Sequence, residues 1–202
     1  MSDILCITNR FLCNEDFLVR IEKIASCNPK GIILREKDLS ENEYKFLAKQ
    51  VMDICHKYDT LCILHSFTNV AIELGSNAIH LPLNILRKMT LEEKKHFSII
   101  GASCHSISEL NEAAKLGCSY VTIGHIFDTD CKKGLPGQGT AFLKELCDSA
   151  RPNANLLVYA IGGITPANCH EVLNCGAKGI CIMSSIMSCK DVAKYISEFN
   201  AV

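Results

Sequence analysis

The sequence has 202 residues, and because a domain holds roughly 150 residues, it is expected to form one domain over positions 1–202 with a substantial core. Hydrophobic residues make up 48% of the chain and charged residues 21%, which excludes disordered, collagen-like and long coiled-coil proteins. The 21 Lys and Arg residues nearly balance the 22 Asp and Glu residues, and no block of like charge occurs, so the composition argues against nucleic-acid and membrane partners.

Two features indicate a cytoplasmic protein. No apolar stretch approaches the roughly 18 residues of a membrane helix, and the start, Met1-Ser2-Asp3, lacks the basic region of a signal peptide.

The thirteen cysteines include no Cys-x-x-Cys pair, so the spacing of a zinc ribbon or a thioredoxin-like redox pair is missing. We therefore expect free thiols that pack as small hydrophobic side chains.

Short runs rich in Ile, Leu and Val recur along the whole chain. Each run is nearly continuous in apolar residues rather than alternating, which is typical of parallel strands that are buried on both faces. Eight such runs predict eight strands, at 4–9, 31–36, 61–66, 78–83, 98–104, 120–127, 156–163 and 179–186.

Helical patterns lie between these runs. Residues 39–58 show apolar residues at helical spacing after a capping pair, Ser40 and Glu43. The same device opens a helix over 106–116, and a third helix is predicted from Thr165-Pro166 to Gly176.

Eight strands alternating with helices predict a single (β/α)₈ TIM barrel, with a doubly wound sheet as the alternative. Two of the strand-to-strand spacings, from 61 to 78 and from 78 to 98, are short for a full crossover. The helices in these two connections are therefore expected to be shortened.

In a TIM barrel the active site lies at the C-terminal ends of the strands, so polar residues there are the candidate site residues. Gly162-Gly163 and Ser184-Ser185 follow strands seven and eight, where barrels commonly bind a phosphate, although glycines also serve simply in tight turns. The other polar residues at strand ends are Arg35, Glu36, Lys37, His65, Ser66, Ser103, His105, His125 and the segment 128–134.

His125 is the best acid–base candidate because an imidazole at the barrel mouth titrates near neutral pH. The alternative is a histidine that is buried and hydrogen-bonded by its neighbours, and His65 is a second candidate.

Carboxylates follow only two of the strands, so no metal site is expected. Cys131 lies among charged residues that could lower its thiol pKa, with an inert loop thiol as the alternative.

Four motifs stand at the ends of predicted strands: Leu-Arg-Glu-Lys at 34–37, Ser-Cys-His-Ser at 103–106, Gly-His-Ile-Phe-Asp-Thr-Asp-Cys-Lys-Lys-Gly at 124–134, and Ala-Ile-Gly-Gly-Ile-Thr-Pro at 160–166. In order and spacing they resemble the thiamin-phosphate synthase superfamily, from strand two to strand eight. One branch of that superfamily is the synthase, which joins a pyrimidine diphosphate to a thiazole phosphate with Mg²⁺. The other is the TenI-like thiazole tautomerase.

Several positions depart from the synthase pattern. His-Ser-Phe at 65–67 stands where the synthase has Asn-Asp-Arg with a metal-binding aspartate, and 82–85 lacks the second metal-binding aspartate. Ile33 replaces the glutamine that holds the pyrimidine ring. The motif at 124–134 matches the tautomerase branch, with His125 at the position of its acid–base histidine.

The resemblance to that branch implies an isomerase that aromatises a carboxythiazole phosphate without metal or cofactor. His125 would move the proton and Arg35 would hold the carboxylate. The remaining substrate-binding residues expected are Lys37, Ser103, Thr129, Lys132, Gly162, Gly163, Ser184 and Ser185. Family members tend to be dimers, which implies a homodimer.

Two alternatives remain open. The first is a synthase that binds Mg²⁺ at a divergent site made of Glu36, Asp128 or Asp130, and formation of thiamin phosphate would support it. The second is a barrel that binds a thiazole phosphate or a thiamin metabolite without turnover, because a phosphate site does not imply catalysis.

Overall fold

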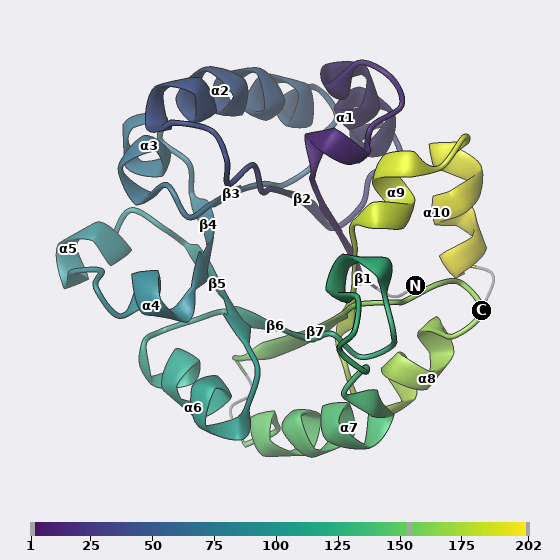
Figure 1. Ribbon diagram of the computed structural model, residues 1–202. Coiled ribbons are helices and arrows are strands. Elements are labelled where there is room, and N and C mark those ends of the chain that lie inside the picture. The colour runs from purple at the N-terminus through teal and green to yellow at the C-terminus, as the bar shows by residue number, and fades with distance from the viewer. Residues whose placement is uncertain (1–2, 153–154, 201–202) are drawn as a thin grey trace.

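The computed structural model describes residues 3–152 and 155–200. Eight strands in these residues form a closed barrel in which each strand pairs in parallel with the next and β8 pairs with β1. This arrangement confirms the predicted (β/α)₈ barrel (Figure 1). The strands are β1 (Asp3–Ile7), β2 (Gly31–Leu34), β3 (Cys62–His65), β4 (Ala78–Pro82), β5 (Ile99–Cys104), β6 (Tyr120–Gly124), β7 (Leu157–Ile161) and β8 (Gly179–Ile182).

Helices surround the barrel and cover its outer face (Figure 1). In the described residues they are α1 (Phe17–Ala25), α2 (Glu41–Lys57), α3 (Thr68–Glu73), α4 (Leu83–Leu86), α5 (Leu91–Lys94), α6 (Ile107–Lys115), α7 (Gly139–Ala150), α8 (Cys169–Asn174), α9 (Ser184–Ser188) and α10 (Val192–Asn200), with short 3₁₀ helices η1 (Arg10–Leu12) and η2 (Asp130–Lys132). None of these helices is long and apolar enough to cross a membrane.

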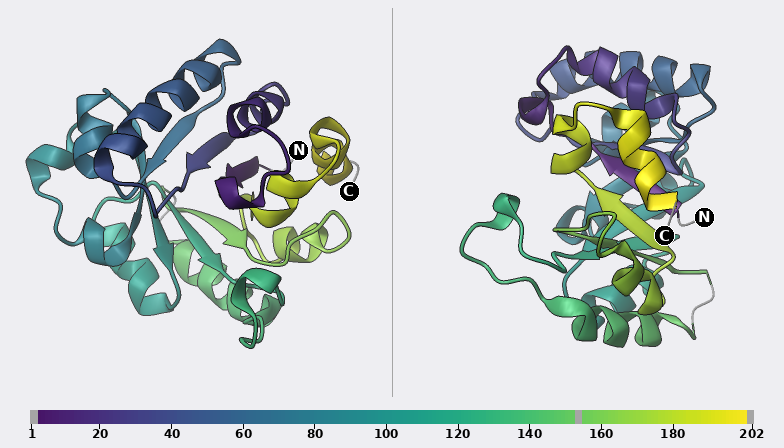
Figure 2. Two further views of the ribbon diagram at one scale, coloured as in Figure 1. Left: turned by 45° about the horizontal axis from the view of Figure 1, so that its top comes forward. Right: turned by 90° about the vertical axis from the view of Figure 1, so that its right-hand side faces the viewer.

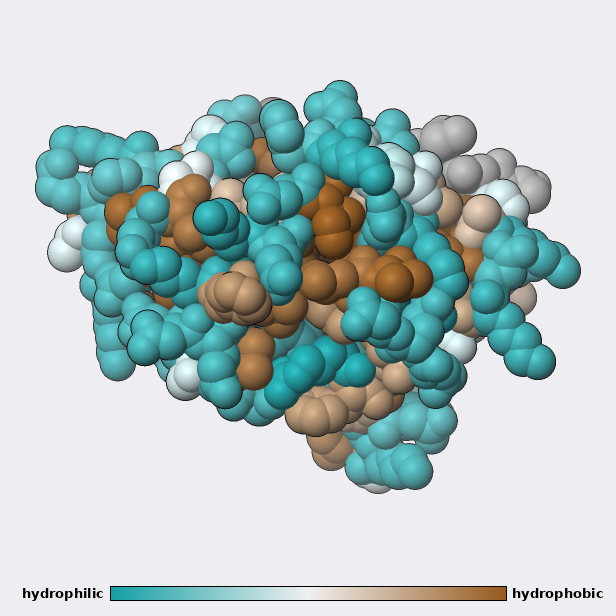
Figure 3. All heavy atoms as spheres, turned by 90° about the horizontal axis from the view of Figure 1, so that it is seen from above, coloured by the Kyte–Doolittle hydropathy of each residue, from teal (hydrophilic) through white to brown (hydrophobic). Residues whose placement is uncertain are grey.

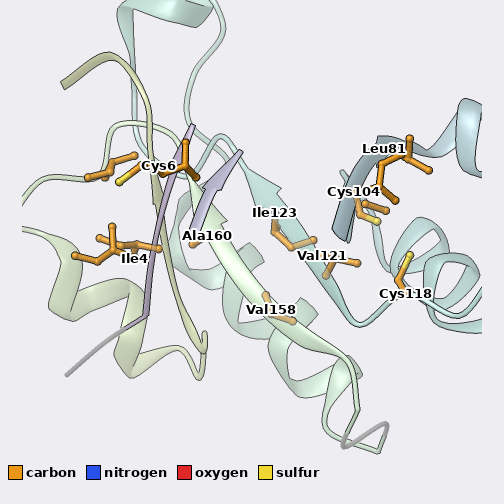
Figure 4. Close-up of a cluster of buried hydrophobic side chains, with 14 of the residues drawn as sticks. Ile4, Cys6, Leu81, Cys104, Cys118, Val121, Ile123, Val158 and Ala160 are labelled. Atoms are coloured by element: carbon orange, nitrogen blue, oxygen red, sulfur yellow. The ribbon is translucent and has the colours of Figure 1, made fainter. Parts of the chain in front are cut away.

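The main core lies between the barrel and the helices, and Figure 4 shows part of it. Val121 and Ile123 of β6 and Val158 of β7 belong to it, together with several cysteines. Burial raises the pKa of Cys104 to about 12, which makes this thiol an inert apolar side chain at neutral pH. All thirteen cysteines lie in the described residues and none forms a disulfide.

The helix caps expected from the sequence are present. The Ser40 hydroxyl accepts from the Glu43 N–H, and the Glu43 carboxylate accepts from the Ser40 N–H at 2.9 Å, so α2 begins with a capping box. Ser106 caps α6 in the same position through the N–H of Glu109, at 3.2 Å. The shortened connections are also confirmed, since α3 has six residues and α4 and α5 have four each.

The start of α8 differs from the expectation. The helix begins at Cys169 rather than at Thr165-Pro166, because residues 165–168 form a turn. The Asn168 side chain accepts from the Thr165 N–H at 2.8 Å and donates to the Gly163 carbonyl at 3.0 Å. This local bonding offers the backbone an alternative to the first helical turn.

A second, smaller cluster fills the barrel interior, and it combines aliphatic side chains with the rings of Tyr120 and Tyr159. The rings of His80, Tyr120 and Tyr159 follow one another across the barrel, with centroids 5.5 Å and 5.6 Å apart. Gly101 makes room for this layer, because a Cβ there would lie 2.1 Å from Cζ of Tyr120. The ring layer therefore requires glycine in β5.

The face that carries α1 and α2 is mostly polar (Figure 3). Seen from the side of α1 and α2, hydrophilic side chains surround separate hydrophobic areas (Figure 3). Val19 of α1 and Phe46 of α2 are among the exposed large hydrophobic side chains. Figure 2 shows that the segment between β6 and α7 extends far beyond one end of the barrel, beside the candidate site described next.

Candidate functional site

The site residues predicted from the sequence all lie at one end of the barrel. All eight strands are parallel to their neighbours, so the segments that follow their C-terminal ends share the barrel mouth. Arg35 and Lys37 follow β2, Ser103 lies near the end of β5, and the β6–α7 segment carries His125, Thr129 and Lys132. Gly162 and Gly163 follow β7, and Ser184 and Ser185 begin α9 directly after β8.

Three cations gather at this mouth. Loss of hydration and then the nearby charges of Arg35 and Lys132 lower the pKa of Lys37. The effect of Lys132 on Lys37 indicates that the segment after β6 lies near the segment after β2, although the two are distant in sequence. Such a cluster favours a multiply charged anion.

The carboxylates of the same region are already engaged. Glu36 is buried and accepts from the Thr8 hydroxyl at 2.6 Å, the Arg10 N–H at 3.1 Å and the Arg10 guanidinium at 3.1 Å. Asp38 accepts from the same guanidinium, which holds the pKa of its carboxyl below the usual range. The Thr8 hydroxyl also accepts from the Arg35 N–H at 2.9 Å, so this network fixes the backbone that carries Arg35.

Mg²⁺ keeps several waters and is usually bound by one or two carboxylates together with substrate phosphates. No three His, Cys, Asp or Glu side chains in residues 3–152 and 155–200 gather closely enough to hold a metal. The remaining strand-end carboxylate, Asp128, accepts from the Gly137 N–H at 2.7 Å. Internal donors hold two of the three carboxylates considered for a divergent metal site, Glu36 and Asp128, so that site stays a prediction.

The glycine pair after β7 forms a tight turn and also leaves backbone N–H groups free for a phosphate, the two roles considered for it. Gly162 and Gly163 have positive φ angles of 101° and 65°. A Cβ would lie 2.3 Å from the His125 Cβ at the first position and 2.5 Å from the Asp128 carbonyl oxygen at the second, so the turn requires glycine. In the part of the chain that the structure describes, neither glycine N–H donates a hydrogen bond to the protein.

The loop after β8 lies next to this pair, since Ile161 is in register with Cys181. Ser184 and Ser185 are half-buried and form the first turn of α9, where N–H groups lack partners within the helix. Buried Arg20 of α1 holds the other end of α9 by donating to the carbonyls of Ile186 at 3.3 Å and Cys189 at 2.9 Å.

His125 is tied to the β6–α7 segment. Its Nε2–H donates to the Leu135 carbonyl at 3.1 Å, across a loop of ten residues. The same segment encloses a pocket of about 540 Å³ whose lining includes Thr129 and Lys132. Thr129 caps η2, with its hydroxyl accepting from the N–H of Cys131, an exposed residue.

Two further histidines lie deeper in the mouth, and both are buried. Burial and then the neighbouring charges, His80, Lys37 and Arg35, lower the pKa of His65 to about 2. Burial and then Lys37 and Arg35 lower the pKa of His80 to about 3. Both imidazoles are therefore neutral at physiological pH, and they stack with ring centroids 5.6 Å apart.

Sequence reasoning missed the partners of Ser103. His80 Nε2 lies 2.9 Å from the Ser103 hydroxyl, and His80 Nδ1 lies 3.0 Å from the Tyr120 hydroxyl. The Thr122 hydroxyl is 3.4 Å from the same serine. A polar residue at an inward position of a buried strand was the available signal, but its partners on β5 and β6 depend on the barrel register.

Comparison with known proteins gives consistent matches. Residues 4–186 match the family described as thiamine monophosphate synthase. A protein of Streptococcus pneumoniae serotype 4 named thiamine-phosphate synthase 2 is 30% identical, covering 92% of this chain and 88% of its own length. The thiamine-phosphate synthase of Clostridium tetani is 32% identical, covering 83% of this chain and 78% of its own length.

The solved structures agree with this assignment. Thiamine phosphate pyrophosphorylase from Pyrococcus furiosus superposes with a TM-score of 0.82 at 26% identity, covering 99% of this chain and 94% of that one. A 3-hexulose-6-phosphate synthase also superposes, with a TM-score of 0.71 over 100% of this chain and 99% of its own, but at 16% identity it shares only the fold.

The expectation of a thiazole tautomerase is wrong, because the curated relatives at about 30% identity are named thiamine-phosphate synthase. The departures at positions 65–67 and 82–85 and the motif at 124–134 led to that expectation. They do not separate the chain from relatives that it matches over most of its length. The chain belongs to the thiamine monophosphate synthase family.

Proposed function

We propose that this chain is a thiamine-phosphate synthase, a transferase that joins a hydroxymethylpyrimidine diphosphate to a thiazole phosphate. The names of its relatives support this proposal. The observation that carries it is the presence of two regions suited to anions at one barrel mouth: the cations at 35, 37 and 132, and the loops at 162–163 and 184–185. Two phosphorylated substrates need two such regions.

The cation cluster is the proposed site of the diphosphate. The product carries one phosphate, so the bond between the pyrimidine half and its diphosphate breaks while the bond to the thiazole forms, and diphosphate leaves. Arg35, Lys37 and Lys132 stabilise the negative charge that develops on this leaving group. A bound anion also relieves the repulsion among the three cations, which adds to the loss of hydration in lowering the pKa of Lys37.

The loops after β7 and β8 are the proposed site of the thiazole phosphate. The N–H groups of Gly162 and Gly163 and those of the first turn of α9 supply donors without a charged side chain. Ser184 adds a hydroxyl group at the start of α9, whereas the Ser185 side chain is hydrogen-bonded to Tyr195 of α10. Fixing both substrates at one mouth contributes to the rate through positioning.

His125 has a positioning role in this proposal. Its bond to the Leu135 carbonyl holds the β6–α7 segment, which carries Thr129 and Lys132 to the mouth. The synthase branch implies a Mg²⁺ ion, but internal donors hold Glu36 and Asp128, and no step is assigned to the ion.

The test is an assay of thiamine phosphate and diphosphate formation from the two substrates, run with Mg²⁺ and with a chelator. We expect wild-type protein to form both products in equal amounts. Lys37→Ala is expected to reduce kcat/KM by about tenfold or more, the value of a hydrogen bond to a charged group. Lys178→Ala is the matched control, since this half-exposed lysine lies beside Asp3 at the opposite end of the barrel.

Failure of the wild-type protein to form thiamine phosphate under either condition would refute the proposal. Binding of both substrates without turnover would instead support a non-enzymatic binding protein. Equal losses in Lys37→Ala and Lys178→Ala would show that the cation cluster has no special part. Sedimentation of the same preparation tests the homodimer that the family resemblance implies.

A further inference from the structure

The interior of the barrel holds a chain of polar groups that the proposed reaction has not yet used. It runs from the Tyr120 hydroxyl through the His80 imidazole to the Ser103 hydroxyl, with distances of 3.0 Å and 2.9 Å. Tyr120 and His80 are 4% and 3% exposed, so both are buried polar groups that need hydrogen-bond partners. The direction of the hydrogen bonds along this chain follows from the available donors.

The Tyr120 hydroxyl determines which groups donate and which accept along this chain. A buried hydroxyl donates to an acceptor whenever one is within reach, and across 3–152 and 155–200 His80 Nδ1 is the acceptor found for this one. An imidazole that accepts at Nδ1 and is neutral carries its single hydrogen on Nε2. The neutral form agrees with the environment of His80, because burial and then the charges of Lys37 and Arg35 lower its pKa to about 3.

Ser103 consequently accepts hydrogen bonds from the protein. The Nε2–H of His80 donates to its Oγ at 2.9 Å, and the Thr122 hydroxyl donates to the same oxygen at 3.4 Å. With both protein neighbours acting as donors, the hydrogen of the Ser103 hydroxyl has no acceptor among them. This side chain is half-buried near the end of β5, so its hydrogen is directed to the barrel mouth.

We propose that Tyr120 and His80 are positioning residues that fix the Ser103 hydroxyl as a hydrogen-bond donor to an oxygen of the bound diphosphate. Arg35 and Lys37 lie close enough to His80 to act on it electrostatically, and His80 lies 2.9 Å from the Ser103 hydroxyl, so an anion that the two cations attract enters the region of Ser103. This inference rests on the proposed function for the identity of the anion. Under this proposal, Tyr120 and His80 of the buried ring layer contribute to diphosphate binding as well as to packing.

The experiment measures binding of inorganic pyrophosphate by calorimetry to the whole protein. Ser103→Ala is expected to weaken binding by about tenfold, the value of a hydrogen bond to a charged group. Tyr120→Phe removes only a hydroxyl and is expected to weaken binding severalfold, because the serine hydrogen then turns partly toward His80. Tyr159→Phe is the matched control: its ring touches Tyr120, but its hydroxyl donates to Asp3 at 3.1 Å.

The double variant Tyr120→Phe/Ser103→Ala decides between positioning and packing. If Tyr120 acts through Ser103, the double variant binds pyrophosphate as Ser103→Ala does. A further loss in the double variant, or wild-type binding by Tyr120→Phe, would overturn the proposal. His80→Asn, which cannot bridge the two hydroxyls, is expected to reproduce the loss in Tyr120→Phe and serves if that variant fails to fold.

The binding assay separates this inference from the proposed function. Absence of thiamine phosphate formation by the wild-type protein would refute the function and leave the pyrophosphate result standing. Absence of pyrophosphate binding by the wild-type protein would overturn the assignment of Ser103 as a donor to diphosphate. Equal weakening by Tyr159→Phe and Tyr120→Phe would show that loss of either hydroxyl acts through packing alone.

Discussion

The two buried histidines make the stability of the barrel depend on pH below neutrality. His65 and His80 have pKa values of about 2 and about 3 in the folded protein, against 6.5 for an ordinary histidine. At pH 5 the folded protein leaves both imidazoles neutral, whereas the unfolded chain protonates them. The free energy of unfolding therefore falls as the pH is lowered from 7 to 5.

The size of this loss is set by the unfolded chain alone. Once the folded pKa is well below 5, its value no longer matters between pH 7 and pH 5. An unfolded-state pKa of 6.5 then gives a loss of about 1.9 kcal/mol for each histidine. The two together account for roughly 4 kcal/mol, a large share of the stability of a typical domain.

Urea unfolding followed by circular dichroism at pH 7 and pH 5 measures this loss. His80→Asn is expected to lose about 2 kcal/mol less than the wild-type protein on going to pH 5, whatever its stability at pH 7. His170→Asn is the control, because this histidine of α8 is exposed. An identical pH response in wild type and His80→Asn would refute the assignment of a neutral, buried His80.

Three other predictions concern packing, capping and the mouth. Gly101→Ala is expected to destabilise the protein by about 1–3 kcal/mol in urea unfolding, because its Cβ would meet the Tyr120 ring; retention of wild-type stability would contradict the ring layer. Ser40→Ala removes the cap of α2 and is expected to cost about 1 kcal/mol, which calorimetry would record as a Tm lower by roughly 2–4 °C; an unchanged Tm would contradict the capping box. Glu36→Gln leaves Arg10 without a buried anion and is expected to weaken pyrophosphate binding by at least a few fold, measured by calorimetry; unchanged binding would show that Glu36 does not fix the backbone of Arg35.

The barrel is predictable from the sequence because each strand is buried on both faces. The Ile-rich runs of β2 and β8 cannot face water on either side, so only a sheet covered by helices and filled within accommodates them. The capping pair Ser40 and Glu43 is local and is equally predictable. The start of α8 was mispredicted because Asn168 bonds to the backbone of the preceding turn.

The site was predictable only in part, for a physical reason. Residues such as Arg35 and Lys132 are found from their position after a strand, since parallel strands bring these positions to one end. The Glu36 carboxylate accepts hydrogen bonds from Arg10 and Thr8. These residues precede it by 26 and 28 positions and contact it only in the folded barrel. A strand-end carboxylate therefore looks like a metal ligand in the sequence and acts as an internal anchor in the structure.

The balance of charge at the mouth points to an anionic substrate. Arg10 engages the carboxylates of Glu36 and Asp38, which leaves this trio with one net negative charge against the three cations Arg35, Lys37 and Lys132. Protonation of the neighbouring histidines would add positive charge beside Arg35 and Lys37, which together with burial keeps both imidazoles neutral. A divalent cation entering alone would meet the same repulsion, whereas a diphosphate relieves it. In the proposed function, attraction for diphosphate therefore depends on the Arg and Lys side chains of this chain, at a mouth where the synthases of the family resemblance have metal-binding aspartates.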